Sequence, residues 1–158
     1  MAKQTKTNAM RMLDTLGIAY THIEYEADEF TDAAETAARL NLPHENMFKT
    51  LVTVGNDRAH YVFVIPIDEE LDLKKCARAV GVKSVQMIHQ KELLPLTGYL
   101  RGGCTAIGMK KPFVTRIDES AILFDTIWVS AGRIGCQMQL APDDFCRAAN
   151  AEYADLTA

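Results

Sequence analysis

Hydrophobic residues recur with two different periods along this chain of 158 residues. Apolar positions three or four residues apart, bounded by capping residues, glycine or proline, predict helices. These helices are expected over 7–16, 32–40, 72–80 and 91–94, and from 142 onward. Runs rich in β-branched and aromatic residues predict strands instead. The strands are expected over 18–25, 48–54, 60–65, 84–88, 113–117, 124–129 and 135–140.

Several element ends carry specific signals. Asp32 and Glu35 have the spacing of a capping box, and Pro95 is expected to end the helical turn before it. The Gly-Asn-Asp-Arg segment at 55–58 separates two β-rich runs and indicates a hairpin. Strands outnumber long helices, and hairpins alternate with helical crossovers. The sequence therefore predicts an α+β fold, a mixed and mostly antiparallel sheet surrounded by helices, in a single domain spanning 1–158.

The composition is that of a water-soluble globular protein, with 48% hydrophobic and 24% charged residues. No apolar run approaches the length of a membrane span, and the N-terminal segment lacks the apolar core of a signal peptide. We therefore expect a cytoplasmic protein. The four cysteines and four histidines are scattered without metal-ligand spacing, so we expect no metal site and free thiols that mostly lie in the core.

Charge is distributed unevenly. Residues 72–111 contain eight lysines and arginines and two acids, a net charge of +6. The rest of the chain contains nine lysines and arginines and nineteen acids, a net charge of −10. A protein with this distribution is not a general coat for nucleic acids. The basic block is either a place that holds a few phosphates or a solvated face that binds nothing.

Residues 98–111, GYLRGGCTAIGMKK, contain four glycines and three cations. The spacing matches neither a Walker A loop nor a dinucleotide-binding fingerprint. On the pattern alone, a loop that cradles phosphate or carbonyl groups and a glycine-rich surface hairpin are equally good interpretations. Cys104 lies in this loop, but no histidine is placed to serve as its base, so we expect a small structural residue rather than a nucleophile.

Two further segments have local patterns with a functional and a plain interpretation. Lys49 stands at the head of a hydrophobic strand, where it either points into a pocket or protects a strand edge from aggregation. Residues 130–135, SAGRIG, form either a second small-residue loop facing 98–111 or an ordinary hairpin. In both cases the plain interpretation is the commoner one.

The order and spacing of several motifs resemble the YbaK family of aminoacyl-tRNA deacylases. These motifs are FKTLV at 48–52, LDLKK at 71–75, the glycines within 97–103, GMKK at 108–111 and VSAG at 129–132. The resemblance extends from about Tyr20 to the C-terminus. It implies a free-standing editing domain, related to the insertion domain of bacterial prolyl-tRNA synthetase, that removes cysteine from mischarged Cys-tRNA(Pro).

The resemblance also implies roles for individual residues. Lys49 corresponds to the essential lysine, and Gly102, Gly103 and Gly108 to the loop that holds the ester and the terminal adenosine. The other residues expected to contact the substrate are Tyr25, Phe30, Thr50, Arg101, Ser130 and Gly132. The family chemistry uses the thiol of the substrate as nucleophile, and we expect no cofactor and no metal. The expected partners are the acceptor end of tRNA and prolyl-tRNA synthetase.

Two positions depart from the family pattern. Thr105 and Ala106 replace a Ser-Pro pair, and Gln137 occupies the place of an acidic residue. Two alternative functions therefore remain open at the level of sequence. The protein would either deacylate another misacylated tRNA, such as Ala-tRNA(Pro), through attack by water, or serve as a non-catalytic module that binds tRNA ends or a synthetase.

Overall fold

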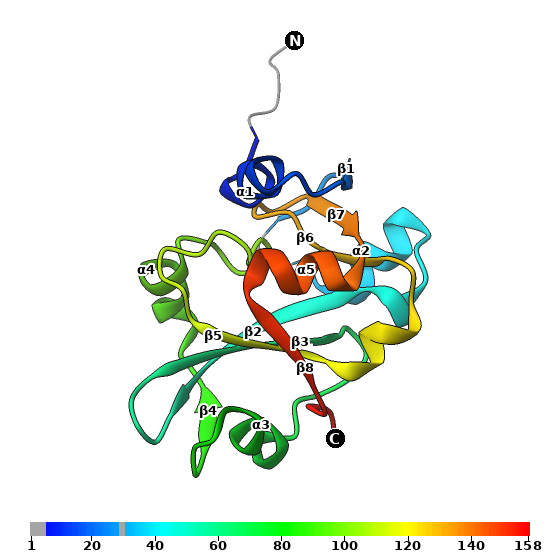
Figure 1. Ribbon diagram of the computed structural model, residues 1–158. Coiled ribbons are helices and arrows are strands. Elements are labelled where there is room, and N and C mark those ends of the chain that lie inside the picture. The colour runs from blue at the N-terminus through cyan, green and yellow to red at the C-terminus, as the bar shows by residue number, and fades with distance from the viewer. Residues whose placement is uncertain (1–5, 29–30) are drawn as a thin grey trace.

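The computed structural model describes residues 6–28 and 31–158, and their strands form two sheets (Figure 1). The smaller sheet has the order β1-β7-β6, with β1 at Thr21–Glu24, β7 at Cys136–Leu140 and β6 at Ile127–Ser130. The larger sheet has the order β4-β2-β3-β5-β8. Its strands are β2 (Phe48–Gly55), β3 (His60–Pro66), β4 (Val85–Met87), β5 (Val114–Asp118) and β8 (Ala151–Ala154).

Most of the strand pairs are antiparallel, as predicted, and the pairs of β3 with β5 and of β5 with β8 are parallel. The hairpin of β2 and β3 turns at Gly55–Arg58, the segment in which the sequence indicated it. Two features differ from the expectation. The strands divide into two sheets, joined by a bridge between Met47 and Trp128, and β8 follows the last helix without having been predicted.

The helices are α1 (Asn8–Leu16), α2 (Ala33–Leu40), α3 (Leu73–Val80), α4 (Leu93–Thr97) and α5 (Pro142–Ala149), with 3-10 turns η1 (His44–Asn46), η2 (Gln90–Glu92) and η3 (Glu119–Leu123). The side chain of Asp32 accepts a hydrogen bond from the N–H of Glu35, so it caps α2 as predicted. The expected stop at Pro95 is wrong, because Pro95 lies in the first turn of α4, where a helix needs no N–H donor. Gly98 ends that helix instead.

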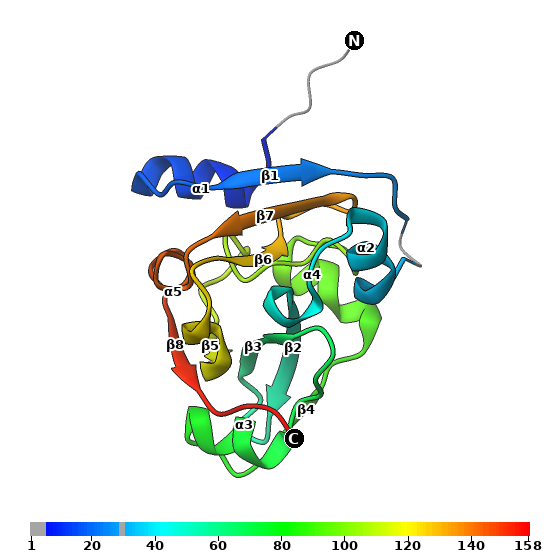
Figure 2. The same ribbon diagram turned by 90° about the vertical axis from the view of Figure 1, so that its right-hand side faces the viewer.

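The core is divided by the larger sheet. One apolar cluster lies between the two sheets, α1 and α5, and includes Phe48, Val64 and Met138. A second cluster, with Phe63 and Ile65, packs under α3 on the opposite face of the larger sheet (Figure 1). Figure 2 shows the small sheet above and α3 below, so that the start of β2 lies where the two sheets and α2 converge.

No helix in the described part of the chain is both long enough and apolar enough to span a membrane.

Candidate active site

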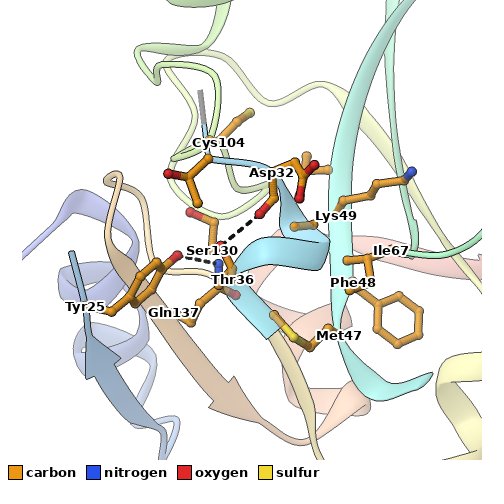
Figure 3. A pocket seen from close by; sticks show the side chains of 14 residues that line it. Tyr25, Asp32, Thr36, Met47, Phe48, Lys49, Ile67, Cys104, Ser130 and Gln137 are labelled. Carbon is orange, nitrogen blue, oxygen red and sulfur yellow. Dashed lines mark hydrogen bonds between the residues drawn. The ribbon is translucent and has the colours of Figure 1, made fainter. Parts of the chain in front are cut away.

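A small cavity opens where the start of β2, the N-terminus of α2, the loop 98–111 and the smaller sheet meet (Figure 3). Its volume is about 110 Å³. Met47 and Phe48 give it an apolar side, and Thr31 and Asp32 at the start of α2 give it a polar one. Cavities for drug-sized ligands occupy roughly 300–1,000 Å³, so this cavity suits a much smaller group.

Five of the residues predicted to contact the substrate line this cavity. They come from segments far apart in the chain, and they are Tyr25, Lys49, Thr50, Gly102 and Ser130. Arg101, Gly103, Gly108 and Gly132 do not line it. Phe30 lies outside the described residues. Thr36 and Asp32 also line the cavity but were not predicted as site residues, because in the sequence they carry only the signature of a helix start.

Lys49 lies at the cavity on an unpaired part of a strand edge. The strand β4 pairs with β2 only over Thr53–Gly55, and β6 joins β2 only through the bridge of Trp128 to Met47, so no described ladder of hydrogen bonds continues along Lys49 on this edge. The register places Lys49 opposite Ile65, and its side chain is half-buried. In Figure 3 its ammonium points away from Tyr25 and Gln137. No described residue forms a hydrogen bond or ion pair with this ammonium, so its flexible four-carbon stem is free to reorient.

The loops 98–111 and 130–135 lie against each other, and their closest approach requires the glycine at 103. A Cβ atom at Gly103 would lie 2.8 Å from the backbone C of Arg133 and the N of Ile134, so this glycine allows the two backbones to touch. Gly108 instead packs against the start of α1, because a Cβ there would lie 2.9 Å from the hydroxyl of Tyr99 and 3.2 Å from backbone atoms of Asn8 and Ala9. The loop 98–111 is therefore a packed wall of the cavity rather than an exposed hairpin.

The N–H groups of this wall differ in their availability. The N–H of Gly103 donates to the carbonyl of Leu100 at 2.9 Å, so it is not free for a ligand. Gly102 and Cys104 both line the cavity, and their N–H groups make no hydrogen bond within the described chain. Backbone N–H groups held at a cavity wall are the donors that stabilise an oxyanion in acyl transfer.

Cys104 is a poor candidate for a nucleophile. Its side chain is only 9% exposed, and burial raises the pKa of its thiol to about 12. The nucleophilic form of cysteine is the thiolate, which is scarce at neutral pH when the pKa is this high. The structure therefore confirms the expectation of a small buried residue at this position. The other three cysteines are also free, as predicted.

Gln137 presents an unsatisfied polar atom at the cavity. It is 9% exposed, and its Nε2 donates to the hydroxyl of Tyr25 at 3.3 Å, whereas its Oε1 is buried without a hydrogen-bond partner. Within the described residues, the only other such side-chain atom is the Oδ1 of Asn46. A buried acceptor without a partner costs about 1–3 kcal/mol, so its retention at a cavity wall points to a ligand donor.

The chain is similar to known proteins over most of its length. The family model of the aminoacyl-tRNA editing domain matches residues 27–148. The protein belongs to this family. An Enterococcus faecalis protein named as a candidate Cys-tRNA(Pro)/Cys-tRNA(Cys) deacylase, EbsC, is 46% identical to this editing domain over 155 residues, which are 98% of this chain and 94% of the relative.

Solved structures have the same fold as this editing domain. A candidate trans-editing enzyme for prolyl-tRNA synthetase superposes with a TM-score of 0.84 at 26% identity, over 98% of this chain and 99% of the other. A hypothetical protein at 24% identity superposes with a TM-score of 0.87 over 96% and 100% of the two chains and shows the fold alone. The resemblance in the sequence and the predicted α+β fold are thus both confirmed.

Other contacts hold the loop of the editing domain at Ala106, where it departs from the family pattern. Ala106 is buried, and the hydroxyl of Tyr99 donates to the carbonyl of the next residue, Ile107, at 2.6 Å. The N–H of Ile107 lies 3.4 Å from the hydroxyl of Thr105. These contacts fix the segment in which the family pattern has a proline.

The high pKa of Cys104 predicts that its thiol is dispensable. Cys104→Ala is expected to keep most of the deacylation activity, and iodoacetamide at pH 8 is expected to leave the wild-type protein active, because little of the thiol is ionised there. Rates of ester loss before and after alkylation test this. A loss of two orders of magnitude in the variant, or an acyl group trapped on Cys104, would make the protein a cysteine-nucleophile enzyme.

Gln137→Met is expected to separate stability from activity. The methionine removes an unsatisfied buried oxygen and one long hydrogen bond, so the free energy of unfolding should stay constant or rise by up to about 2 kcal/mol, whereas deacylation should fall. Urea unfolding and rates of ester loss measure the two effects.

Gln139→Met is the matched control. Its Nε2 donates to the hydroxyl of Thr126 at 2.8 Å, and it does not line the cavity. This variant should lose a little stability and keep its activity. A Gln137→Met protein that is less stable but fully active would show that Gln137 is purely structural.

Proposed function

We propose that this protein is a trans-acting deacylase that removes cysteine from Cys-tRNA(Pro). The carrying observation is the near full-length similarity to the Enterococcus faecalis relative, whose name gives that substrate. The physical need for such an enzyme is clear. Cysteine and proline are similar in size. A difference of about one methylene gives a binding pocket only roughly 1–3 kcal/mol of discrimination between two amino acids. A synthetase for proline therefore needs a second site that removes cysteine after it has been attached.

The cavity supports this substrate through its size and its lining. A volume of about 110 Å³ admits a small aminoacyl group and little else. Tyr25 and Gln137 line the cavity and carry oxygen acceptors, of which the buried Oε1 of Gln137 has no partner, and the α-ammonium of an aminoacyl ester brings N–H donors. Cysteine therefore fits both the volume and the polarity of the cavity.

We infer that the thiol of the substrate is the nucleophile. Its sulfur attacks the ester carbonyl carbon, the carbonyl oxygen becomes an oxyanion, and the bond to the ribose oxygen then breaks. The ribose oxygen takes up the proton that the thiol has lost, so the products are a cysteine thiolactone and free tRNA. The role of the protein is to hold the cysteine in a conformation close to attack. This assignment leaves no task for Cys104, in keeping with its burial.

In this proposal the oxyanion is stabilised by two backbone N–H groups and by the ammonium of Lys49. Gly102 and Cys104 line the cavity, and their N–H groups have no acceptor in the described chain. The ammonium of Lys49 swings across the edge of β2 toward the ester once substrate is bound. Charged and dipolar donors in a small site of this kind contribute about 3–4 kcal/mol each to the transition state.

The substrate of the proposed enzyme is recognised at its end. The name of the Enterococcus faecalis relative includes both Cys-tRNA(Pro) and Cys-tRNA(Cys), and the cavity has room for only the aminoacyl group. We therefore propose that the acceptor end of tRNA is the main partner, with prolyl-tRNA synthetase as the source of the mischarged substrate. The whole chain, 1–158, acts as one editing domain.

Lys49→Met is expected to reduce deacylation by at least about a hundredfold, because it removes a positive charge from the site while keeping the length of the side chain. Its effect on the free energy of unfolding should stay within about 0.5 kcal/mol, since the ammonium has no partner to lose. Lys83→Met is the matched control, because Lys83 is an exposed lysine that lies away from the junction of the two sheets. A Lys49→Met protein with unchanged turnover would remove Lys49 from the mechanism.

The aminoacyl preference tests the proposed function as a whole. The purified protein is incubated with tRNA(Pro) carrying cysteine, serine, alanine or proline, and the loss of each ester is followed. The serine ester should be cleaved at least about tenfold more slowly than the cysteine ester. The reason is that a hydroxyl is almost wholly protonated at neutral pH, whereas a thiol is a few per cent ionised. Alanine and proline esters should be nearly stable.

Comparable rates for the cysteine, serine and alanine esters would identify water as the attacking group and would overturn the cysteine-specific assignment. Preferential cleavage of the alanine ester would establish the alternative function as an Ala-tRNA(Pro) deacylase. Binding without cleavage of any ester would make the protein a recognition module.

A further inference from the structure

The lining of the cavity contains, among the described residues, one carboxylate and one ammonium (Figure 3). The carboxylate belongs to Asp32 at the start of α2, and the ammonium belongs to Lys49 at the start of β2. Neither group forms an ion pair within the described chain. A cavity with opposite charges on two elements that do not join suits a ligand that carries both charges itself.

Capping of α2 occupies only one of the two carboxylate oxygens of Asp32. Its Oδ1 accepts a hydrogen bond from the N–H of Glu35 at 2.8 Å, whereas its Oδ2 accepts none within the described chain. The N–H and the hydroxyl of Thr36 both donate to the carbonyl oxygen of Asp32, at 3.0 and 3.1 Å, and so hold the backbone of the cap. Oδ2 is therefore carried on a fixed backbone and is available to a ligand.

The capping of a helix does not by itself require a charge at this position, because asparagine and aspartate are N-caps of similar strength. The helix α3 begins with a cap of the same type. The Oδ1 of Asp72 accepts hydrogen bonds from the N–H groups of Lys74 and Lys75 at 3.0 and 3.1 Å. Asp72 does not line the cavity, so it shows what a cap does without a ligand nearby.

We propose that Asp32 binds the α-ammonium of the aminoacyl group, together with the unpaired Oε1 of Gln137. The inference rests on the proposed function, which places cysteine in the cavity. An ammonium has three donors and no acceptor. Asp32 and Gln137 line the same small cavity, and the Oδ2 of the first and the Oε1 of the second are acceptors without a partner. Asp32 adds the negative charge that the neutral amide of Gln137 lacks.

The two charges set the direction in which the cysteine lies. With its ammonium at Asp32, the ester carbonyl is directed to the N–H groups of Gly102 and Cys104, within reach of Lys49. The reverse orientation would bring the ammonium of the substrate against that of Lys49, and like charges repel. The contact with Asp32 is the same before and during the reaction, so it acts on KM rather than on kcat.

A pair of substrates that differ only in the ammonium tests this assignment. The mercaptopropionyl ester of tRNA(Pro) is Cys-tRNA(Pro) without the amino group, and it keeps the thiol, the chain length and the ester. The wild-type protein should show a KM for the cysteine ester that is at least about fivefold lower. Asp32→Asn keeps the cap and removes the charge. It should raise the KM of the cysteine ester about three- to tenfold and leave the KM of the mercaptopropionyl ester unchanged.

Asp72→Asn is the matched control, because it makes the same change at a cap away from the cavity. It should keep the wild-type preference for the cysteine ester. Urea unfolding should respond alike to the two variants, which separates a weaker cap from a lost contact with the substrate. An Asp32→Asn protein that retains the full preference, or an Asp72→Asn protein that loses it as well, would overturn the proposal.

Binding of analogues that cannot be cleaved separates failure of this inference from failure of the proposed function. In these analogues an amide joins adenosine to cysteine or to mercaptopropionate. The wild-type protein should bind the cysteine analogue at least about threefold more tightly, and Asp32→Asn should bind the two equally. If this result is found but no ester is cleaved, the ammonium site stands and the deacylase fails. If the cysteine ester is cleaved but both proteins show the same preference, Asp32 is only a cap and the deacylase stands.

Discussion

The contact between the backbones of two loops at Gly103 is the constraint on which the site depends. A Cβ atom there would lie 2.8 Å from backbone atoms of Arg133 and Ile134, closer than a side chain permits. This approach fixes the loop 98–111 against 130–135, and Gly102, Cys104 and Ser130 all line the cavity. The N–H of Gly103 donates to the carbonyl of Leu100, so the N–H groups of Gly102 and Cys104 are the donors that remain available to a ligand.

Sequence reasoning predicted local structure well where the signal is local. The cap at Asp32, the helix expected from residue 72, the hairpin at 55–58 and the start of α5 at Pro142 depend on adjacent residues, and the structure has all of them. Sequence reasoning failed where packing between distant segments decides the local structure. Pro95 is accepted inside a helix because of its place in the first turn, and β8 forms because β5 offers it a free edge.

The site was predictable only in part for the same reason. Motif resemblance named Lys49, Thr50 and Ser130, which line the cavity together, and also Gly103 and Gly108, which do not line it. Gly103 packs against the loop 130–135 and Gly108 against Tyr99 and the start of α1. No pattern in the sequence reveals that Thr36 reaches the cavity, since this depends on how α2 docks on the start of β2. Gln137 stood out only as a departure from the family, and its unpaired Oε1 appears once the fold is known.

The account places the reactive group in the substrate, and the mass of the first product tests this most directly. In a single turnover with Cys-tRNA(Pro), quenched in acid and analysed by mass spectrometry, attack by the substrate thiol predicts that cysteine thiolactone appears before free cysteine, which follows it as the thiolactone hydrolyses. Free cysteine as the first product at every time point, together with release of S-methylcysteine from its own ester at the same rate, would show that water attacks and would contradict the account.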